Sequence, residues 1–169
     1  MEAIRILAPE DAEGFREIRL KGLLDSPESF GSTYEVEANR DIEFFRMRIH
    51  QTSDSFVLGA FDQNGQLIGV VGFKQEHTMK LRHKGMIWGV YVMPGYRSQG
   101  VGRRLMEKAI ELANQIDGLE QINLSVVTGN QGAKKLYESL GFLVYGVEKR
   151  ALKYQGIYDD EELMTLWLH

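Results

Sequence analysis

The sequence predicts an α/β fold in which strands and helices alternate along one domain. Apolar runs typical of strands alternate with stretches whose apolar residues recur every three or four positions, and no linker or internal repeat divides them. The chain has 169 residues, 43% of them hydrophobic, which is enough to form one core without a second domain. We therefore expect a single domain over residues 1–169.

The first half of the chain is expected to contain a strand, two helices and then three strands. Pro9 stands just before a helical pattern, where its fixed φ suits the first turn of a helix. Asn64 and Gly65 favour a tight turn between two apolar runs, which indicates a β-hairpin. The expected elements are a strand at 3–7, a helix at 11–20, a loop at 26–31, a helix at 42–50, and strands at 55–62, 66–75 and 85–92.

The strand at 85–92 is interrupted by Gly89. An interior glycine weakens a strand and often marks a bulge or a place where another group approaches the backbone closely. Relief of crowding against a neighbouring side chain is the simpler alternative. We expect a bulge here.

A turn suited to an anion follows this strand. Gly100 and Gly102 have no Cβ, so an anion can approach the backbone, and the first N–H groups of a following helix lack intrahelical acceptors. Arg103 and Arg104 lie in that first turn, where the helix dipole disfavours cations, and a bound anion would offset this placement. The helix at 101–116 is predicted from a run of apolar residues at helical spacing: Val101, Leu105, Ala109, Leu112, Ala113 and Ile116. The segment predicts a site for a diphosphate.

Two familiar nucleotide-binding loops do not fit this turn. A P-loop needs Lys and Ser or Thr at the positions where Val101 and Gly102 stand. A dinucleotide fingerprint needs a third glycine where Leu105 stands, and no acidic partner for a ribose follows a second strand at the usual distance. The turn is therefore of another kind.

A second motif occupies residues 130–142, after an expected strand at 121–127. Its apolar residues at helical spacing include Tyr137, and Gly141 is a suitable helix stop. By spacing alone, Tyr137 is a core residue of this helix. Two closing strands are expected at 143–152 and 162–168.

Together the two motifs resemble those of the GCN5-related N-acetyltransferase (GNAT) family. The first is Arg97-x-x-Gly100-x-Gly102 after a strand and a break at Pro94, and the second is an Asn that opens a helix ending in Tyr, Gly and Phe. The order of the expected elements also resembles this family over nearly the whole chain. The resemblance implies the GNAT fold: a central mixed, mostly antiparallel sheet of six to seven strands flanked by helices, with a splayed strand pair that holds the coenzyme.

The resemblance also implies a reaction and a set of site residues. Acetyl-CoA would be the cosubstrate, and a primary amine would attack its thioester directly, with no metal. The strand residues Val90, Tyr91 and Val92 would contact the acetyl and pantetheine groups, and Asn130 would contact the pantetheine amides. The turn residues around the diphosphate would be Arg97, Ser98, Gln99, Gly100, Val101, Gly102 and Arg103. Tyr137 stands where the family usually has its general acid.

The general base is not identified by the resemblance. Met86 and Ser125 stand at the two positions where several family members have a glutamate. A water chain or an acid on the acceptor side would then take the proton. The open candidates on that side are Tyr34, Glu35, Glu37, Glu76, His77 and His83, of which the two histidines are expected to be exposed loop residues. The acidic run at 159–162 is expected to be a solvated turn rather than a recess for a cationic amine.

Composition excludes several other functions. The net charge is −4 and no run of Lys and Arg indicates binding to nucleic acid or to an anionic membrane. The chain has no cysteine, which removes disulfides, thiol nucleophiles and cysteine metal sites. The first residues show no signal segment and no apolar run is long enough to span a membrane, so a cytoplasmic location is expected. A homodimer is left open.

The acceptor is expected to be a small molecule with a primary amine. Acetylation of protein N-termini or lysines is the alternative within the enzyme class. A non-catalytic module that only binds acetyl-CoA is the alternative of another class, although such a module could dispense with Tyr137. A purely structural protein would have no reason to keep both glycines and Asn130 together.

Overall fold

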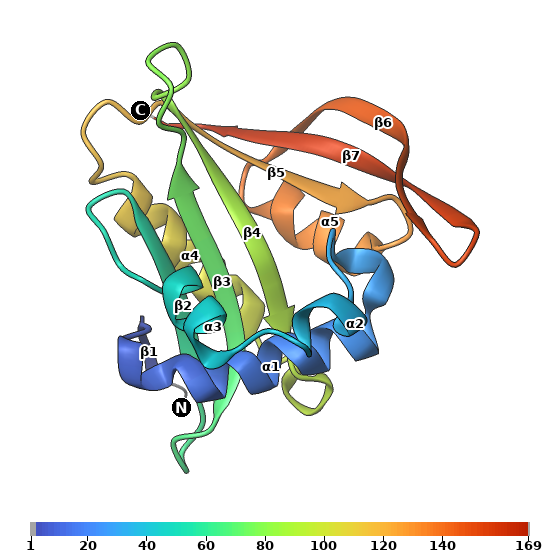
Figure 1. Ribbon diagram of the computed structural model, residues 1–169. Coiled ribbons are helices and arrows are strands. Elements are labelled where there is room, and N and C mark those ends of the chain that lie inside the picture. The colour runs from blue at the N-terminus through green and yellow to red at the C-terminus, as the bar shows by residue number, and fades with distance from the viewer. Residues whose placement is uncertain (1–2, 169) are drawn as a thin grey trace.

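The structure is a computed structural model that describes residues 3–168, so Met1, Glu2 and His169 of the expected domain lie outside the described residues. Within them, seven strands form one mixed sheet in the order β1-β2-β3-β4-β5-β7-β6 (Figure 1). Only the neighbours β4 and β5 are parallel, and every other adjacent pair is antiparallel. This arrangement confirms the predicted mixed, mostly antiparallel sheet flanked by helices.

The elements follow the expected order with one addition, the short helix α2. The strands are β1 (Ala3–Ile6), β2 (Ser55–Phe61), β3 (Leu67–Gln75), β4 (Lys84–Val92), β5 (Gln121–Val127), β6 (Leu143–Tyr154) and β7 (Ile157–Trp167). The helices are α1 (Ala12–Asp25), α2 (Tyr34–Glu37), α3 (Ile42–Arg48), α4 (Val101–Ala113) and α5 (Gln131–Ser139), with 3-10 turns η1 (Pro9–Asp11), η2 (Pro27–Ser29) and η3 (Pro94–Tyr96).

The closing strands differ from the expectation. β6 and β7 are joined tightly at Gln155 and Gly156, both with positive φ, and the expected solvated turn at 159–162 is wrong because these residues belong to β7. Two of these carboxylates have partners in the hairpin or on α5: Asp160 accepts a hydrogen bond from the backbone N–H of Arg150, and Glu162 accepts one from Lys134 Nζ at 3.1 Å. The run of like charges suggested a loop. A strand can hold the same run because successive side chains point to opposite faces of the sheet, which separates neighbouring carboxylates.

Helices cover the two faces of the sheet unequally. The helices α1, α2 and α3 lie over β1 to β4 on one face, and α4 and α5 pack on the other face (Figure 1). The face of β5, β7 and β6 that looks toward the viewer in Figure 1 has no helix over it. We call the side of the sheet that carries α1 to α3 the front face. None of the helices within residues 3–168 is long and apolar enough to cross a membrane.

The parallel strands β4 and β5 pair only at one end. Lys84 to Met86 of β4 face Gln121 to Asn123 of β5, and beyond that point the two strands separate. At Gly89, whose φ is +65°, the register of β4 against β3 shifts, which confirms the predicted bulge. The remainder of β4 therefore presents one edge without a strand partner.

Candidate active site

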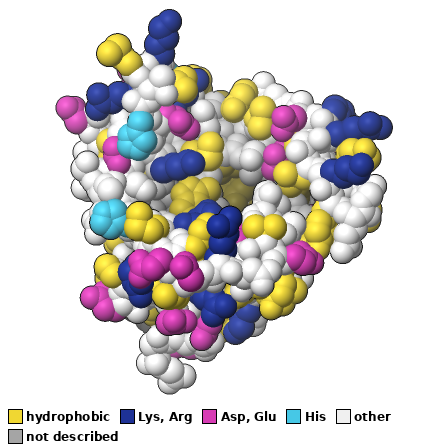
Figure 2. Space-filling model, viewed as in Figure 1, with side chains coloured by type: hydrophobic (Ala, Val, Ile, Leu, Met, Phe, Trp, Pro, Cys, Tyr) yellow, Lys and Arg dark blue, Asp and Glu magenta, His cyan; other side chains and the backbone are white. Residues whose placement is uncertain are grey.

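A cleft of about 790 Å³ lies where β4 and β5 diverge. Strand β4, the turn before α4, the N-terminal end of α4, helix α5 and the segment after α1 supply its walls. In the space-filling view the molecule is hollowed on the front face between its β4 half and its β5–β7 half (Figure 2). The cleft is within the size range of small-molecule sites, roughly 300 to 1,000 Å³.

The sequence-predicted cosubstrate residues meet in this cleft, with one exception. Those that line it are Val90, Tyr91, Val92, Arg97, Ser98, Gly100, Val101, Gly102, Arg103 and Asn130. Gln99 does not line the cleft, and its side-chain amide instead donates a hydrogen bond to the Gly95 carbonyl oxygen at 3.1 Å. Tyr137 also lines the cleft, from the α5 side.

The turn before α4 is shaped to expose backbone N–H groups. Gly100 is the N-cap of α4 with φ of +83°, and Ser98 also has a positive φ of 61°. The N–H groups of Val101 to Arg103 open the helix and have no intrahelical acceptors. A Cβ at Gly102 would meet Leu136 and Val92 at 3.5 and 3.7 Å, so a longer side chain there would extend into the cleft. These features fit an anion such as a diphosphate.

The side chain of Arg97 is already used within the protein. Its Nε donates to the Val92 carbonyl at 2.8 Å, and its Nη2 lies 2.6 Å from Asp25 Oδ2 at the end of α1. The Tyr91 hydroxyl donates to the same carboxylate oxygen at 3.1 Å. The hydrogen bond from Arg97 is the main reason that the pKa of Asp25 is lowered. Arg97 therefore ties the turn to β4 and α1, whereas the backbone N–H groups of the turn stay available to an anion.

Asn130 begins α5 and also faces the cleft. Its side-chain oxygen accepts a hydrogen bond from the Ala133 N–H at 3.2 Å, which is an N-cap interaction. The helix then carries Tyr137 to the cleft wall, where the tyrosine is only 6% exposed and its ring packs edge-on against Phe142 at 6.0 Å. Tyr137 is thus both a core residue, as its spacing suggested, and a cleft residue.

The hydroxyl of Tyr137 has no hydrogen-bond partner in the described part of the chain. Burial raises the pKa of Tyr137 to about 12. The phenol is therefore protonated at neutral pH and can donate its proton or a hydrogen bond to a group that enters the cleft.

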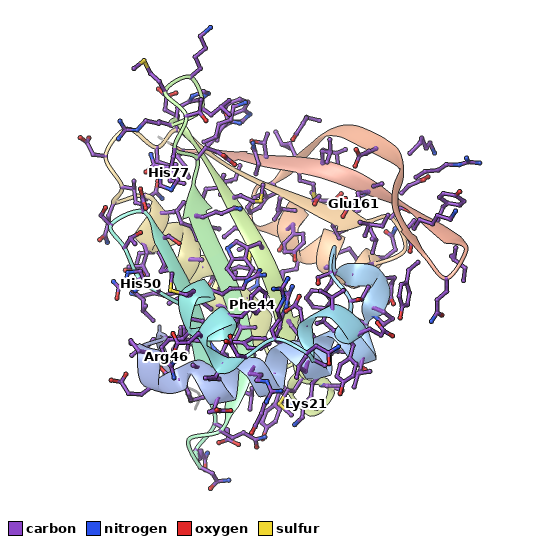
Figure 3. The ribbon with its side chains drawn as sticks, viewed as in Figure 1. Lys21, Phe44, Arg46, His50, His77 and Glu161 are labelled. Atoms are coloured by element: carbon purple, nitrogen blue, oxygen red, sulfur yellow. The ribbon has the colours of Figure 1, made fainter. Side chains whose placement is uncertain are left out.

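The front face next to the cleft carries a half-buried carboxylate, Glu161. In the β5–β7 ladder Glu161 pairs with Val127, and Glu162 lies on the opposite face beside Lys134. Figure 3 shows Glu161 on the front side of the sheet. Burial and, next, the charge of Glu148 raise the pKa of Glu161, and a hydrogen bond from Ser125 offsets only part of this. Ser125 occupies one of the two positions at which the resemblance implies a glutamate in several family members, and Glu161 reaches it from the neighbouring strand.

The other candidate bases are held in other roles or lie elsewhere. Glu37 is buried and accepts two hydrogen bonds from Arg19, at 3.0 and 2.9 Å. Glu35 accepts a hydrogen bond at 2.9 Å from Tyr154, which fastens the β6–β7 hairpin to α2. His77 is exposed beside Asp54, far from the cleft (Figure 3), as expected for a loop histidine.

Some cleft residues gave no signal in the sequence. Ser26, Ser29 and Phe30, from the segment between α1 and α2, line the cleft although no motif surrounds them. Phe30 packs against Tyr91 with ring centroids 6.3 Å apart, an approach that only the tertiary fold creates. Glu161 was missed because its acidic neighbours favoured a loop interpretation.

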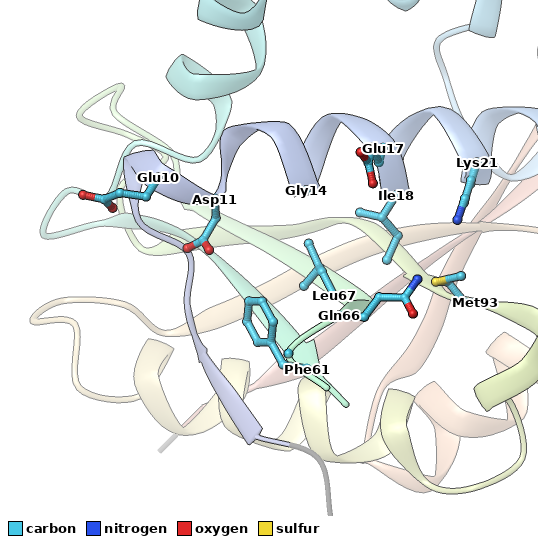
Figure 4. A pocket seen from close by; sticks show the side chains of 11 residues that line it. Glu10, Asp11, Gly14, Glu17, Ile18, Lys21, Phe61, Gln66, Leu67 and Met93 are labelled. Atoms are coloured by element: carbon cyan, nitrogen blue, oxygen red, sulfur yellow. The ribbon is translucent and has the colours of Figure 1, made fainter. Parts of the chain in front are cut away.

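A second, smaller hollow of about 260 Å³ lies between α1 and the β2–β3 hairpin (Figure 4). Its walls include Glu10, Glu17 and Lys21, and it contains none of the residues of the two motifs. Within residues 3–168, no three His, Cys, Asp or Glu side chains are grouped closely enough to hold a metal ion.

Comparison with known proteins gives a consistent result. A model described as the acetyltransferase (GNAT) family matches residues 20–142. Human N-alpha-acetyltransferase 30 is 27% identical over 165 residues, which are 97% of this chain and 44% of the human protein. The acetyltransferase PseH of Campylobacter jejuni is 28% identical over 120 residues, 71% of each chain. A catalytic subunit of the Arabidopsis thaliana N-terminal acetyltransferase B complex is 35% identical over 78 residues, 46% of this chain. The chain spans 44% and 41% of the human and Arabidopsis proteins.

Solved structures share the fold over the whole chain. A GNAT-family acetyltransferase from Streptococcus pneumoniae superposes with a TM-score of 0.83 at 25% identity, covering 99% of this chain and 100% of that one. A Salmonella typhimurium protein solved with its cofactor acetyl-CoA superposes with a TM-score of 0.85 at 24% identity, covering 100% of this chain and 95% of that one.

Proposed function

We propose that this chain, which belongs to the acetyltransferase (GNAT) family, transfers the acetyl group of acetyl-CoA to the primary amine of a small molecule. The observation that carries this proposal is the cleft itself. It brings the anion-binding turn, the unpaired edge of β4 and the protonated Tyr137 to one place.

Three parts of the cleft support binding of acetyl-CoA. The turn at Gly100 to Arg103 would receive the diphosphate on backbone N–H groups. Beyond Met86 the edge of β4 that faces β5 has no strand partner, so an extended pantetheine arm can bond there as an added strand. Asn130 lies on the facing wall, at the start of α5.

The chemistry requires two proton movements. The amine nitrogen forms a bond to the acetyl carbon, the carbon–sulfur bond breaks, and the sulfur leaves with the bonding electrons. Tyr137 donates a proton or a hydrogen bond to that sulfur, and backbone N–H groups near Val92 stabilise the negative charge on the carbonyl oxygen. Glu161, through Ser125 or a water molecule, accepts the proton that the amine releases.

The size of the acceptor is inferred from the hollow that Figure 2 shows on the front face, which we call the front recess. The bond between Tyr154 and Glu35 connects the β6–β7 hairpin to α2, so the front recess is bridged at this end. A bridged recess favours a small amine over a folded protein segment. Acetylation of protein N-termini is the second candidate, because the relatives named above include two N-terminal acetyltransferases.

The proposal is tested by acetyl-CoA binding and by turnover. In a thermal scan acetyl-CoA should raise the melting temperature, since ligand at 100 times its dissociation constant adds about 2.7 kcal/mol of stability. A panel of small primary amines and short peptides with free N-termini is then assayed for release of coenzyme A thiol. Turnover with small amines supports the proposal, and turnover with peptides alone supports the second candidate. Binding without turnover would make the chain an acetyl-CoA-binding module, and no thermal shift at millimolar acetyl-CoA would overturn the cleft assignment.

A further inference from the structure

Arg48 ends α3 on the front face, beside the bulge in β4. Its guanidinium carbon lies 4.6 Å from the centroid of the Trp88 ring and 5.7 Å from that of Phe44. Trp88 immediately precedes Gly89, so these contacts bring the guanidinium close to the part of β4 that continues into the cleft. Figure 3 shows Phe44 over the middle of the sheet on this face.

Arg48 is half-buried and has no hydrogen bond or ion pair within residues 3–168. Glu37 is the carboxylate whose charge acts on Arg48, but both of its oxygens already accept hydrogen bonds from Nε and Nη2 on one edge of the Arg19 guanidinium. Burial and the charge of Arg19 lower the pKa of Arg48, and Glu37 offsets only part of this. The three side chains together therefore hold one positive charge that the protein does not neutralise.

The surroundings of Arg48 leave its N–H groups available to a ligand. Aromatic rings contact the face of a guanidinium, whereas its donors point outward in the plane and suit a planar anion with two oxygens. The Arg48 nitrogens are not among the buried side-chain atoms that lack a hydrogen-bond partner. Since they make no hydrogen bond, they must be accessible to solvent.

The β6–β7 side of the front face is acidic. Figure 3 shows Glu161 on this face, and Glu148 is directly paired with it across β6 and β7, so the two side chains lie on the same side of the sheet. The front face next to the cleft therefore carries a cation beside β4 and two carboxylates on β6 and β7. A molecule with an amine and an anionic group is complementary to both.

We propose that the acceptor carries an anionic oxygen group, a carboxylate or a phosphonate, in addition to its amine, and that Arg48 binds this group. This inference rests on the proposed function and adds the chemical class of the acceptor.

The test compares matched acceptors on the wild type and two variants. The acceptors are a series of amino acids of increasing length, the corresponding amides, and the corresponding aminophosphonates. For the wild type kcat/KM should be at least about tenfold higher for the best acid than for its amide, as expected of a charge-assisted hydrogen bond. In Arg48→Met this preference should fall to about one, while turnover of the amides changes less than about twofold. Comparing the acid with the phosphonate identifies which anion is preferred.

Arg46→Met is the matched control, because Arg46 lies two residues earlier on α3 and is paired with Glu43 at the surface. Arg46→Met should leave the preference for the acid over the amide unchanged. Arg48→Met should be as stable as the wild type, because the repulsion between Arg48 and Arg19 is removed.

Calorimetric titration of the same acids and amides in the presence of coenzyme A provides a readout without turnover. If Arg48→Met binds the acid more weakly than the wild type does, the inference is supported. Absence of acetyl transfer would contradict only the proposed function, not this inference. Equal binding of acid and amide by the wild type, or equal effects of both variants, would overturn the role of Arg48.

Discussion

The two sides of the cleft are built differently. The proposed cosubstrate side consists of residues close together in sequence, from Val90 to Arg103 and from Asn130 to Tyr137, and it offers mainly backbone groups. The proposed acceptor side, on the front face next to the cleft, consists of single side chains from separate elements: Arg19 of α1, Arg48 of α3 and Glu161 of β7.

This difference explains what each side can tolerate. Backbone N–H groups bind an anion once the turn has the correct conformation. A few glycines at fixed spacing are enough to allow that conformation. Side-chain recognition depends on charge and position, and each residue on the acceptor side can be changed with little effect on the turn. We therefore expect variants on one side to leave the function of the other intact.

The largest effect is expected from Glu37→Ala on the acceptor side. Glu37 and Arg19 form a buried pair with side chains 1% and 8% exposed, and removal of one partner leaves the other charge unpaired. The free energy of unfolding should fall by about 3 to 5 kcal/mol. Chemical denaturation measures this, with Glu35→Ala as a control that should cost far less because Glu35 is exposed.

The pH dependence of this effect follows from the pKa of Glu37. Burial alone would raise this pKa, but the hydrogen bonds and charge of Arg19 outweigh burial and lower it from its ordinary value of 4.5. The contribution of Glu37 to stability is therefore complete above that value and is lost as the pH falls through the lowered pKa. The stability of the wild type and Glu37→Ala should converge in acid. A constant difference down to pH 2 would contradict the ion-pair explanation.

The next effect is expected from Glu161→Gln, which removes the proposed base. Turnover near neutral pH should fall about 100-fold and recover as the pH rises and the amine loses its proton unaided. Because the pKa of Glu161 is raised in the folded protein, its ionisation costs stability, and Glu161→Gln should be more stable than the wild type at neutral pH. This advantage should disappear below the ordinary pKa of 4.5.

Glu162→Gln is the control for position and charge, since Glu162 points to the opposite face and bonds Lys134. Its pH–rate profile should keep the shape of the wild-type profile. An unchanged acid limb in Glu161→Gln would remove this residue from the mechanism.

A smaller effect is expected from Tyr137→Phe on the cosubstrate side. The ring and its contact with Phe142 remain, so stability and acetyl-CoA affinity should change little. Turnover should fall at least tenfold, which corresponds to about 1.4 kcal/mol of activation free energy, because the hydroxyl proposed to donate to the sulfur is lost. Steady-state kinetics with the best amine measures this. Turnover close to the wild type in a folded variant would leave Tyr137 as a packing residue.

The sequence predicted the turn, the bulge in β4 and helix α5 because their signals are local. Gly100 and Gly102 mark the turn, Gly89 marks the bulge, and the helix period places Tyr137 on the apolar face of α5. Gln99 was included by position in the motif, but its side chain turns back to Gly95. Motif position does not determine side-chain direction.

The acceptor side could not be predicted in the same way. Arg48 is one of many arginines in the sequence, and only the fold places it on Trp88 without a carboxylate partner. Glu161 stands in an acidic run that is typical of a loop, and its direction is fixed by pairing with Val127 across the sheet. Contacts between residues distant in sequence carry no local pattern.

The most direct test is calorimetric titration of acetyl-CoA into Gly102→Glu and Gly95→Glu. Both variants add the same charge to the same turn, but only Gly102 lines the cleft, and a Cβ at Gly95 meets nothing within 4 Å. The dissociation constant of acetyl-CoA for Gly95→Glu should be within about threefold of the wild-type value. For Gly102→Glu it should be at least 100-fold higher, a loss of about 2.8 kcal/mol of binding free energy. Circular dichroism confirms that both are folded. A folded Gly102→Glu that binds acetyl-CoA as tightly as Gly95→Glu would contradict the assignment of this turn as the diphosphate site.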